Sequence, residues 1–342
     1  MNSKPKKMSR LLDRQIGTRR KLCVVGIAVL LLVLSMLSFS VSTFVAFHMP
    51  TERGTTLDRV LHTGELRVGA TLDYAPFSME CLERAGGADI EMAGRLAASL
   101  NAKMIVYKTT WSSLIQDAKD GHFDIAVGGI SITLQRLRAV AMSRPLLHGG
   151  KVVVAPCGSP CLYEPMAALN RPSTRVAVNP GGTNEDFVRQ TLGNTTVQLV
   201  AQNDQFHAIL HDQANFTVTD DVEAKLQALR YPGALCAALN HLETHDRKAY
   251  LLPQRSDVPW AAYVNAWLES ETAPQAGAHS SYNATLERWL ALSAKLVTGD
   301  ATSSPAASGA SSSSSSTSSG HEGLVCEMPP GASQAAPLLN HV

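Results

Sequence analysis

The chain has 342 residues, of which 45% are hydrophobic and 17% charged, and its formal net charge is +1 at pH 7. This length predicts two or three domain-sized units. Because the charge is balanced and no basic stripe runs through the body of the chain, the composition argues against a nucleic acid as partner.

The N-terminus combines a basic segment, residues 1–21, with an uncharged apolar stretch over residues 22–47. The stretch is long enough to cross a bilayer as a helix. The basic residues before it place the N-terminus in the cytosol and the body outside the cell or in a lumen. A cleaved signal peptide is the alternative, but the stretch is long for one and no clear Ala-x-Ala site follows. We therefore predict a single-pass membrane protein anchored through this stretch, or a secreted protein if the anchor is cleaved.

Two other features fit a body outside the cytosol. Sequons for N-glycosylation begin at Asn194, Asn215 and Asn283, which is typical of a glycoprotein, although such triplets also occur by chance. Cysteines at positions 81, 157, 161, 236 and 326 follow the apolar stretch, so at least one lacks a partner within this part of the chain. Cys157 and Cys161 flank a Gly-Ser-Pro turn, which is compatible with a disulfide loop and lacks the further ligands of a zinc site.

Apolar strands alternate with helical patterns in the first part of the body. Strands are predicted over residues 66–70, 103–107 and 123–127, with helices around 90–100 and 114–118 between them. This βαβαβ order implies parallel strands. The composition changes over residues 143–151, where we predict that the chain crosses into a second lobe.

The second lobe repeats this alternation. Further strands are predicted over residues 151–155, 176–178, 197–200, 216–219 and 249–252. The last should return the chain to the first lobe, where helices around residues 257–270 and 282–297 close the fold. The Ser-rich residues 301–342 cannot bury a core and are predicted to be a disordered tail. The predicted domains of the body are lobe 1, residues 56–148 plus 247–298, and lobe 2, residues 149–246.

Two α/β lobes joined by two crossings enclose a cleft. In parallel sheets, ligands bind beyond the carboxyl ends of the strands. Four loops should meet there, at residues 73–74, 129–131, 182–185 and 220.

The turn over residues 179–185 reads Asn-Pro-Gly-Gly-Thr-Asn-Glu and links a strand to a helix. Thr183 suits the N-cap, and the free N–H groups of the first helical turn form an anion site. Glu185 in that turn is either a partner of the helix dipole or a general acid. The second role requires a closed apolar cleft that raises its pKa.

Other candidates have a structural alternative as well. Arg136 can bind a carboxylate with its two-pronged guanidinium, or it is an ordinary charge on a solvated helix. Tyr74 and Trp111 can form walls around a ring, or they are packing residues. Asp220 follows a strand and is either an N-cap or a ligand contact. No histidine spacing demands a metal.

Several segments together resemble the periplasmic cyclohexadienyl dehydratases, which have the two-lobed, type II fold of the family 3 solute-binding proteins. These segments are residues 73–77, 111, 129–136, 179–185, 219–220 and 248–253. The resemblance covers residues 57–295, and the run over 179–185 is its most specific part. It implies a substrate, prephenate or arogenate, that loses its ring hydroxyl as water together with CO2. The product is phenylpyruvate or phenylalanine, and no cofactor or metal takes part.

The resemblance also implies roles for individual residues. Glu185 matches the general acid, and Arg136 matches the residue that holds the substrate carboxylate. Tyr74 and Trp111 match ring contacts, and Asp220 matches the position that holds an amino group in amino-acid-binding relatives. The remaining predicted substrate-binding residues are Asp73, Gly129, Ser131, Thr183 and Asn184.

The functional prediction is therefore a dehydratase of phenylalanine biosynthesis that binds a small carboxylate between two lobes. The alternative is a non-catalytic solute-binding protein for an amino acid or a similar carboxylate. Glu185 distinguishes the two, because a binding protein has no need of a general acid.

Overall fold

The computed structural model describes residues 30–31, 33–35, 54–81, 84–201, 204–273, 281–296 and 338–339. The chain divides into two compact units, Met1–Gly54 and Thr55–Val342. In the first unit, the described residues 30–31 and 33–35 are helical and exposed.

The predicted membrane anchor over residues 22–47 falls mostly outside the described residues. Among the residues that are described, no helix is both long enough and apolar enough to cross a membrane. A bilayer span needs roughly 20 consecutive apolar helical residues, and the described ranges supply none. The prediction of a single-pass membrane protein is corrected accordingly.

We use the name lobe 1 for the larger sheet of the second unit with the helices and the small sheet that pack on it. The strand order of the larger sheet is β16-β5-β1-β6-β15-β7. Its strands are β1 (Glu65–Ala70), β5 (Lys103–Lys108), β6 (Ile125–Ala126), β7 (Ala141–Met142), β15 (Leu251–Leu252) and β16 (Leu338–Leu339). β1 is parallel to β5 and β6, as the βαβαβ pattern predicts, whereas the returning strand β15 is antiparallel to β6 and β7.

The helices of lobe 1 are α2 (Thr56–Thr63), α3 (Ala88–Ser99), α4 (Leu114–Lys119), α5 (Leu134–Ala139), α10 (Val258–Thr272) and α11 (Ser281–Lys295). The small sheet consists of β2 (Asp73–Tyr74), β3 (Ser78–Cys81) and β4 (Arg84–Gly86). The apolar face of α3 covers β1: Leu66, Val68, Ile90, Met92 and Leu96 are at most 2% exposed. Each such side chain stabilises the fold by about 1.5–3 kcal/mol relative to an exposed position.

Lobe 2 contains a two-stranded sheet, a three-stranded sheet and the helices that connect their strands. Its strands are β9 (Lys151–Pro156), β10 (Arg175–Val178), β11 (Thr196–Leu199), β12 (Thr217–Asp220) and β13 (Leu235–Ala237). Its helices are η1 (Pro160–Leu162), α6 (Met166–Leu169), α7 (Thr183–Thr191), α8 (Asp204–Leu210) and α9 (Asp221–Arg230). β10 and β11 are parallel, as predicted, but β12 and β13 both run antiparallel to β9.

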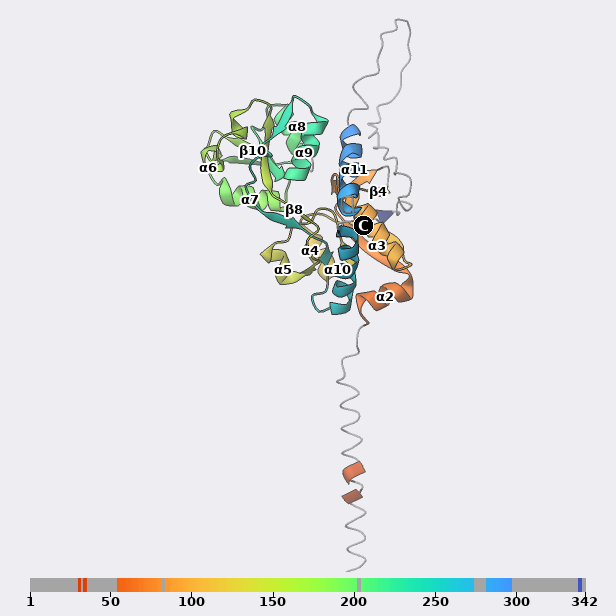
Figure 1. Ribbon diagram of the computed structural model, residues 1–342. Helices are drawn as coiled ribbons and strands as arrows, with labels where there is room; N and C mark the ends of the chain where they lie inside the picture. The colour runs from red at the N-terminus through yellow and green to blue at the C-terminus, as the bar shows by residue number, and fades with distance from the viewer. Residues whose placement is uncertain are drawn as a thin grey trace, which may run out of the picture. The chain divides into compact units, whose positions relative to one another are not determined.

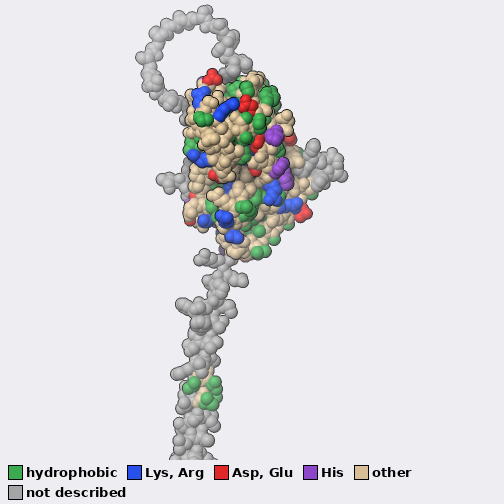
Figure 2. Space-filling model, turned by 90° about the vertical axis from the view of Figure 1, so that its left-hand side faces the viewer, with side chains coloured by type: hydrophobic (Ala, Val, Ile, Leu, Met, Phe, Trp, Pro, Cys, Tyr) green, Lys and Arg blue, Asp and Glu red, His purple; other side chains and the backbone are tan. Residues whose placement is uncertain are grey.

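Two strands carry the chain between the lobes. β8 (Leu147–Gly149) leaves lobe 1, β14 (Asp246–Lys248) returns to it, and the two pair antiparallel. Figure 1 shows β8 between helices α6–α9 of lobe 2 and helices α4, α5 and α10 of lobe 1. The composition change at residues 143–151 thus marks the first crossing. In Figure 2, Lys and Arg side chains lie among acidic and neutral ones on the face shown and form no continuous stripe there.

The disulfide of lobe 2 does not join Cys157 to Cys161, the loop with which the sequence is compatible. Cys157 pairs with Cys236, whose Cα lies 4.8 Å away, and Cys161 is free. The pairing follows from the ladder, since Cys157 directly follows β9 while Cys236 lies in β13, which is antiparallel to β9. Of the predicted tail, residues 301–342, the structure describes only Leu338 and Leu339, and these form a strand parallel to β5.

Candidate functional site

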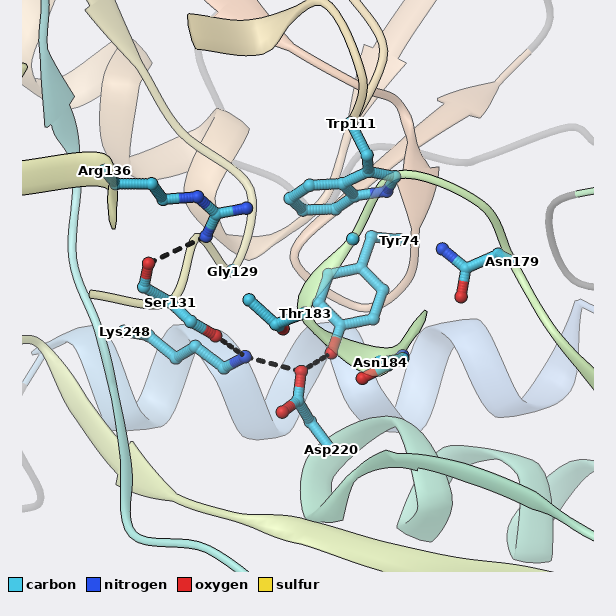
Figure 3. Close-up of a pocket in the computed structure, with 11 residues that line it drawn as sticks. Tyr74, Trp111, Gly129, Ser131, Arg136, Asn179, Thr183, Asn184, Asp220 and Lys248 are labelled. Carbon is cyan, nitrogen blue, oxygen red and sulfur yellow. Dashed lines mark hydrogen bonds and ion pairs between the residues drawn. The ribbon is translucent and has the colours of Figure 1, made fainter. Parts of the chain in front are cut away.

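A pocket lies where the two lobes meet, and Figure 3 shows its lining residues. The lining consists of Tyr74, Trp111, Gly129, Ser131, Arg136, Asn179, Gly182, Thr183, Asn184, Asp220 and Lys248. Lobe 1 supplies the first five, lobe 2 the next five, and Lys248 comes from the crossing strand β14. The predicted cleft between the lobes is therefore present, with side chains from all four predicted loops.

Aromatic rings form the wall on the side of lobe 1. The rings of Tyr74 and Trp111 meet edge to face, with centroids 5.6 Å apart and an interplanar angle of 89°. Tyr74 also stacks on Phe77 at 5.3 Å. Gly129, with φ 67°, permits this packing, because a Cβ there would lie 2.7 Å from ring atoms of both Tyr74 and Phe77.

Arg136 is buried at this wall, with 8% of its surface exposed. The N-cap Thr133 starts α5 so that Arg136 lies in its first turn, and Nη1 donates to the carbonyl oxygen of Ser131 at 2.7 Å. The guanidinium carbon lies 5.9 Å from the centroid of Trp111. Among the described residues, no carboxylate lies within hydrogen-bonding distance of this guanidinium. Burial lowers the pKa of Arg136, and a bound anion would relieve that cost.

The N-terminus of α7 forms the opposite wall. Thr183 was predicted as the N-cap, but Gly182 takes that position and makes no side-chain capping bond. The hydroxyl of Thr183 instead accepts a hydrogen bond from Lys151 Nζ at 3.0 Å. Asn184 is buried and its Nδ2 donates to Thr219 Oγ1 at 3.3 Å, while its Oδ1 has no partner among the described residues.

Asp220 anchors a buried network of charges at the base of the pocket (Figure 3). Its Oδ1 accepts from Lys151 at 2.8 Å, and its Oδ2 accepts from both Lys248 and the Tyr74 hydroxyl. Burial acts to raise the pKa of Asp220, but the ammonium groups of Lys151 and Lys248 outweigh it and hold that pKa below its usual range. Asp220 is the N-cap residue of α9 yet makes no side-chain capping bond, so its carboxylate faces the pocket rather than the helix.

Glu185 does not line the pocket. Its Oε2 accepts from the backbone N–H of Gly181 at 2.7 Å, and its Oε1 accepts from Arg189 at 2.7 Å. The Gly181 hydrogen bond, together with Arg189, lowers the pKa of Glu185. Successive helical residues differ by about 100° in direction, so Asn184 can face the pocket while Glu185 faces its own helix end.

Asp73 is the other predicted site residue that does not line the pocket. It precedes Tyr74 in β2, and successive side chains of a strand point to opposite faces. Two lining residues, Asn179 and Lys248, belong neither to the predicted site residues nor to the four predicted loops. A lysine directly before the apolar returning strand is the signal that would have indicated Lys248.

Comparisons with known proteins agree with this architecture. Residues 66–291 match the family described as bacterial extracellular solute-binding proteins, family 3. The chain belongs to this family. Its two lobes form the type II fold of that family, and the family's extracellular character also counts against the predicted membrane localisation.

Among curated relatives, a cyclohexadienyl dehydratase from Pseudomonas aeruginosa is 39% identical over 238 residues, covering 68% of this chain and 85% of the relative. A lysine/arginine/ornithine-binding periplasmic protein from Escherichia coli is 24% identical over 191 residues, covering 54% of this chain and 72% of the relative. The solved structures include an ancestral amino acid-binding protein described as a precursor of cyclohexadienyl dehydratase, with a TM-score of 0.62. It is 28% identical and covers 69% of this chain and 100% of its own.

Proposed function

We propose that the protein is a dehydratase that acts on prephenate or arogenate in the pocket between its lobes. The observation that carries the proposal is the buried guanidinium of Arg136, which lacks a carboxylate partner among the described residues and lies beside the ring of Trp111. A pocket with an unpaired cation and aromatic walls suits a ring that bears a carboxylate. The 39% identity to a cyclohexadienyl dehydratase, against 24% to an amino-acid-binding relative, supports the enzyme.

The reaction makes modest demands on the protein. The ring C–O bond breaks and the hydroxyl leaves as water after it receives a proton. The bond to the ring carboxylate breaks as CO2 departs, and its electron pair completes the aromatic ring. The protein must hold the carboxylates, exclude water and supply one proton, which are the roles of Arg136, the aromatic wall and an acid.

We assign the role of proton donor to Glu185, and its position outside the pocket requires that its side chain move before it can act. Its carboxylate is held by Gly181 and Arg189, outside the pocket, with a lowered pKa. An acid must be protonated and within hydrogen-bonding reach of the leaving oxygen. Glu185 therefore acts only after its side chain leaves these partners and turns toward the substrate, where burial between the closed lobes raises its pKa.

A solute-binding protein for an amino acid or a similar carboxylate is the second candidate. The resting position of Glu185 favours it, since the pocket is complete as a binding site without this carboxylate. The 28% identical ancestral amino acid-binding protein, which covers 69% of this chain, also supports it.

The test compares turnover and binding in one set of full-length proteins. Phenylpyruvate absorbance is followed with prephenate, and phenylalanine release with arogenate, for wild type and Glu185→Gln. Glu269→Gln on α10 is the matched control, because its side chain is 73% exposed and does not line the pocket. We expect Glu185→Gln to lower kcat by about 10²–10⁴-fold, with unchanged calorimetric binding of phenylpyruvate. Turnover that survives in Glu185→Gln would remove Glu185 as the acid. Binding of an amino acid by a wild type without any turnover would establish the second candidate.

A further inference from the structure

We propose that this pocket selects a keto acid with two carboxylates over the corresponding α-amino acid, and that Lys151 and Lys248 impose the selection by occupying Asp220. The inference rests on the proposed function, because it names which of the two substrates the site takes. It assigns prephenate, which has a keto group, and rejects arogenate, which has an ammonium group in its place.

Both carboxylate oxygens of Asp220 already accept hydrogen bonds from buried donors, so a ligand ammonium would have to compete with those donors. Lys151 donates to Oδ1, while Lys248 and Tyr74 donate to Oδ2. All four residues are at most 4% exposed, so water does not compete for these bonds. A ligand ammonium would have to displace a buried lysine from Asp220 or lie beside two ammonium groups. Either arrangement leaves a buried charge poorly compensated, which is strongly unfavourable.

The same lysines also donate hydrogen bonds to the two aliphatic hydroxyl groups of the lining. Lys248 Nζ donates to Ser131 Oγ at 2.8 Å, and Lys151 Nζ donates to Thr183 Oγ1 at 3.0 Å. A hydroxyl that accepts from an ammonium directs its own proton elsewhere. Both hydroxyls can therefore donate their protons to an anionic or carbonyl oxygen of the ligand.

The cation of the lining that lacks a carboxylate partner lies apart from Asp220. Arg136 supplies this cationic point on the opposite side of the lining from Asp220 (Figure 3), and it has no carboxylate partner among the described residues. Asp246 lies 3.5 Å from Lys151 but does not line the pocket, so it offers nothing to a ligand. Arg136 therefore suits one carboxylate of the ligand, and the hydroxyl groups of Ser131 and Thr183 can donate to the other.

The amide side chains of Asn179 and Asn184 also lie in the lining, and an amide oxygen suits a neutral donor. Asn184 Oδ1 is buried and has no partner among the described residues. An amide oxygen alone does not compensate the burial of an ammonium, which requires a carboxylate. It matches instead the ring hydroxyl that both substrates share.

The experiment measures kcat/KM for prephenate and for arogenate in the full-length protein. We expect wild type to favour prephenate by about 100-fold or more, as sites that mispair a buried polar group do. Lys151→Met frees Asp220 Oδ1 without removing a lining residue, and we expect it to shift the ratio toward arogenate by about 10-fold or more. Lys225→Met is the matched control, since this lysine of α9 is 49% exposed and lies outside the pocket. Its ratio should equal that of wild type.

Asp220→Asn keeps the proposal falsifiable if Lys151→Met fails to fold. If Asp220 held the ligand ammonium, this variant would lose arogenate turnover selectively, and that result would overturn the proposal. Equal kcat/KM values for both substrates in wild type would overturn it as well, while leaving the dehydratase function intact.

If the wild-type protein turns over neither substrate, the proposed dehydratase function is wrong, but the selection between keto acid and amino acid can still be tested by binding. Calorimetric titration with prephenate, phenylpyruvate and L-phenylalanine then decides the ligand class. Tighter binding of the two keto acids supports the selection, and tighter binding of phenylalanine overturns it.

Discussion

Glu223 is a buried carboxyl one turn after Asp220 on α9. Its Oε2 accepts from the hydroxyl of Thr219, and its Oε1 has no partner among the described residues. Burial raises the pKa of Glu223 to about 7, against an ordinary value of 4.5. The charged form is thus unfavourable in the folded protein, and the carboxyl remains protonated there at pH values where it ionises in the unfolded chain.

This residue should make stability fall as pH rises. Between its unfolded pKa of 4.5 and its folded pKa of about 7, the folded state binds more protons than the unfolded state. The free energy of unfolding therefore decreases across this range, and the loss is complete above it. At pH 8, Glu223→Gln should have a free energy of unfolding roughly 1–3 kcal/mol higher than that of wild type, because the buried charge is gone. At pH 4 the two proteins should differ little in stability.

Urea unfolding of wild type and Glu223→Gln at several pH values measures this difference. Asp89, whose pKa burial raises to about 6, titrates in the same direction in both proteins and cancels in the comparison. Glu287→Gln, at a position 68% exposed, serves as the control. Parallel pH profiles of wild type and Glu223→Gln would contradict the assignment.

The turn before α7 depends on glycine for two separable reasons. Gly181 has φ 81°, and a Cβ there would lie 2.2 Å from Ser112 Oγ and 3.0 Å from Ser112 N. Ser112 belongs to lobe 1 and directly follows Trp111 of the pocket, so the two lobes approach closely at this point. Gly158 has the same φ of 81°, but a Cβ added there would meet no atom within 4 Å.

Substituting alanine at both glycines separates backbone strain from the contact between lobes. Each variant should lose about 1–2 kcal/mol of unfolding free energy, the usual cost of a left-handed non-glycine residue. Gly181→Ala should in addition weaken ligand binding by about 10-fold or more, because displaced pocket groups lose their geometry. Thermal unfolding and calorimetric titration with phenylpyruvate give the two readouts. Equal affinity in Gly181→Ala and Gly158→Ala would show that the Ser112 contact does not matter for closure.

The two lobes are joined by polar bonds in the pocket as well as by the crossing strands. The Tyr74 hydroxyl of lobe 1 donates to Asp220 of lobe 2, and Lys248 bridges Ser131 and Asp220. These bonds are buried, so each stabilises the closed arrangement more than an exposed bond does.

Tyr74→Phe should therefore favour an open arrangement of the ligand-free protein. The variant removes one bond between the lobes and keeps the ring that packs on Trp111 and Phe77. We expect a larger radius of gyration by small-angle X-ray scattering and an affinity for phenylpyruvate reduced by about 10-fold, the equivalent of one hydrogen bond. Tyr263→Phe is the control, because its hydroxyl bonds to Ser99 within lobe 1. An unchanged radius in Tyr74→Phe would mean that the bond between Tyr74 and Asp220 is not needed to hold the lobes closed.

The local sequence determined the order of the strands and helices and most of the pocket lining. Hydrophobic periodicity and turn residues are local properties of the sequence. The alternation of strands and helices therefore predicted the parallel pairing of β1 with β5. The adjacent glycines predicted the turn before α7. The loops that carry Tyr74, Ser131 and Asp220 could be placed because parallel strands bring their carboxyl ends together. Trp111 and Arg136 were expected in the pocket only from the resemblance to a known family.

Only the tertiary structure decided which groups pair across those loops. Tyr74 and Asp220 are 146 residues apart, and Lys151 meets Asp220 because β9 and β12 run antiparallel with these two residues in register. The same ladder places Cys157 beside Cys236 rather than Cys161. The partners of Glu185, Gly181 and Arg189, are its neighbours in the sequence. Whether its side chain faces the pocket nevertheless depends on how α7 packs in the tertiary structure. The hydrophobic pattern within a segment determines whether it forms a helix or a strand. Long-range register and burial decide which distant side chains form ion pairs and hydrogen bonds.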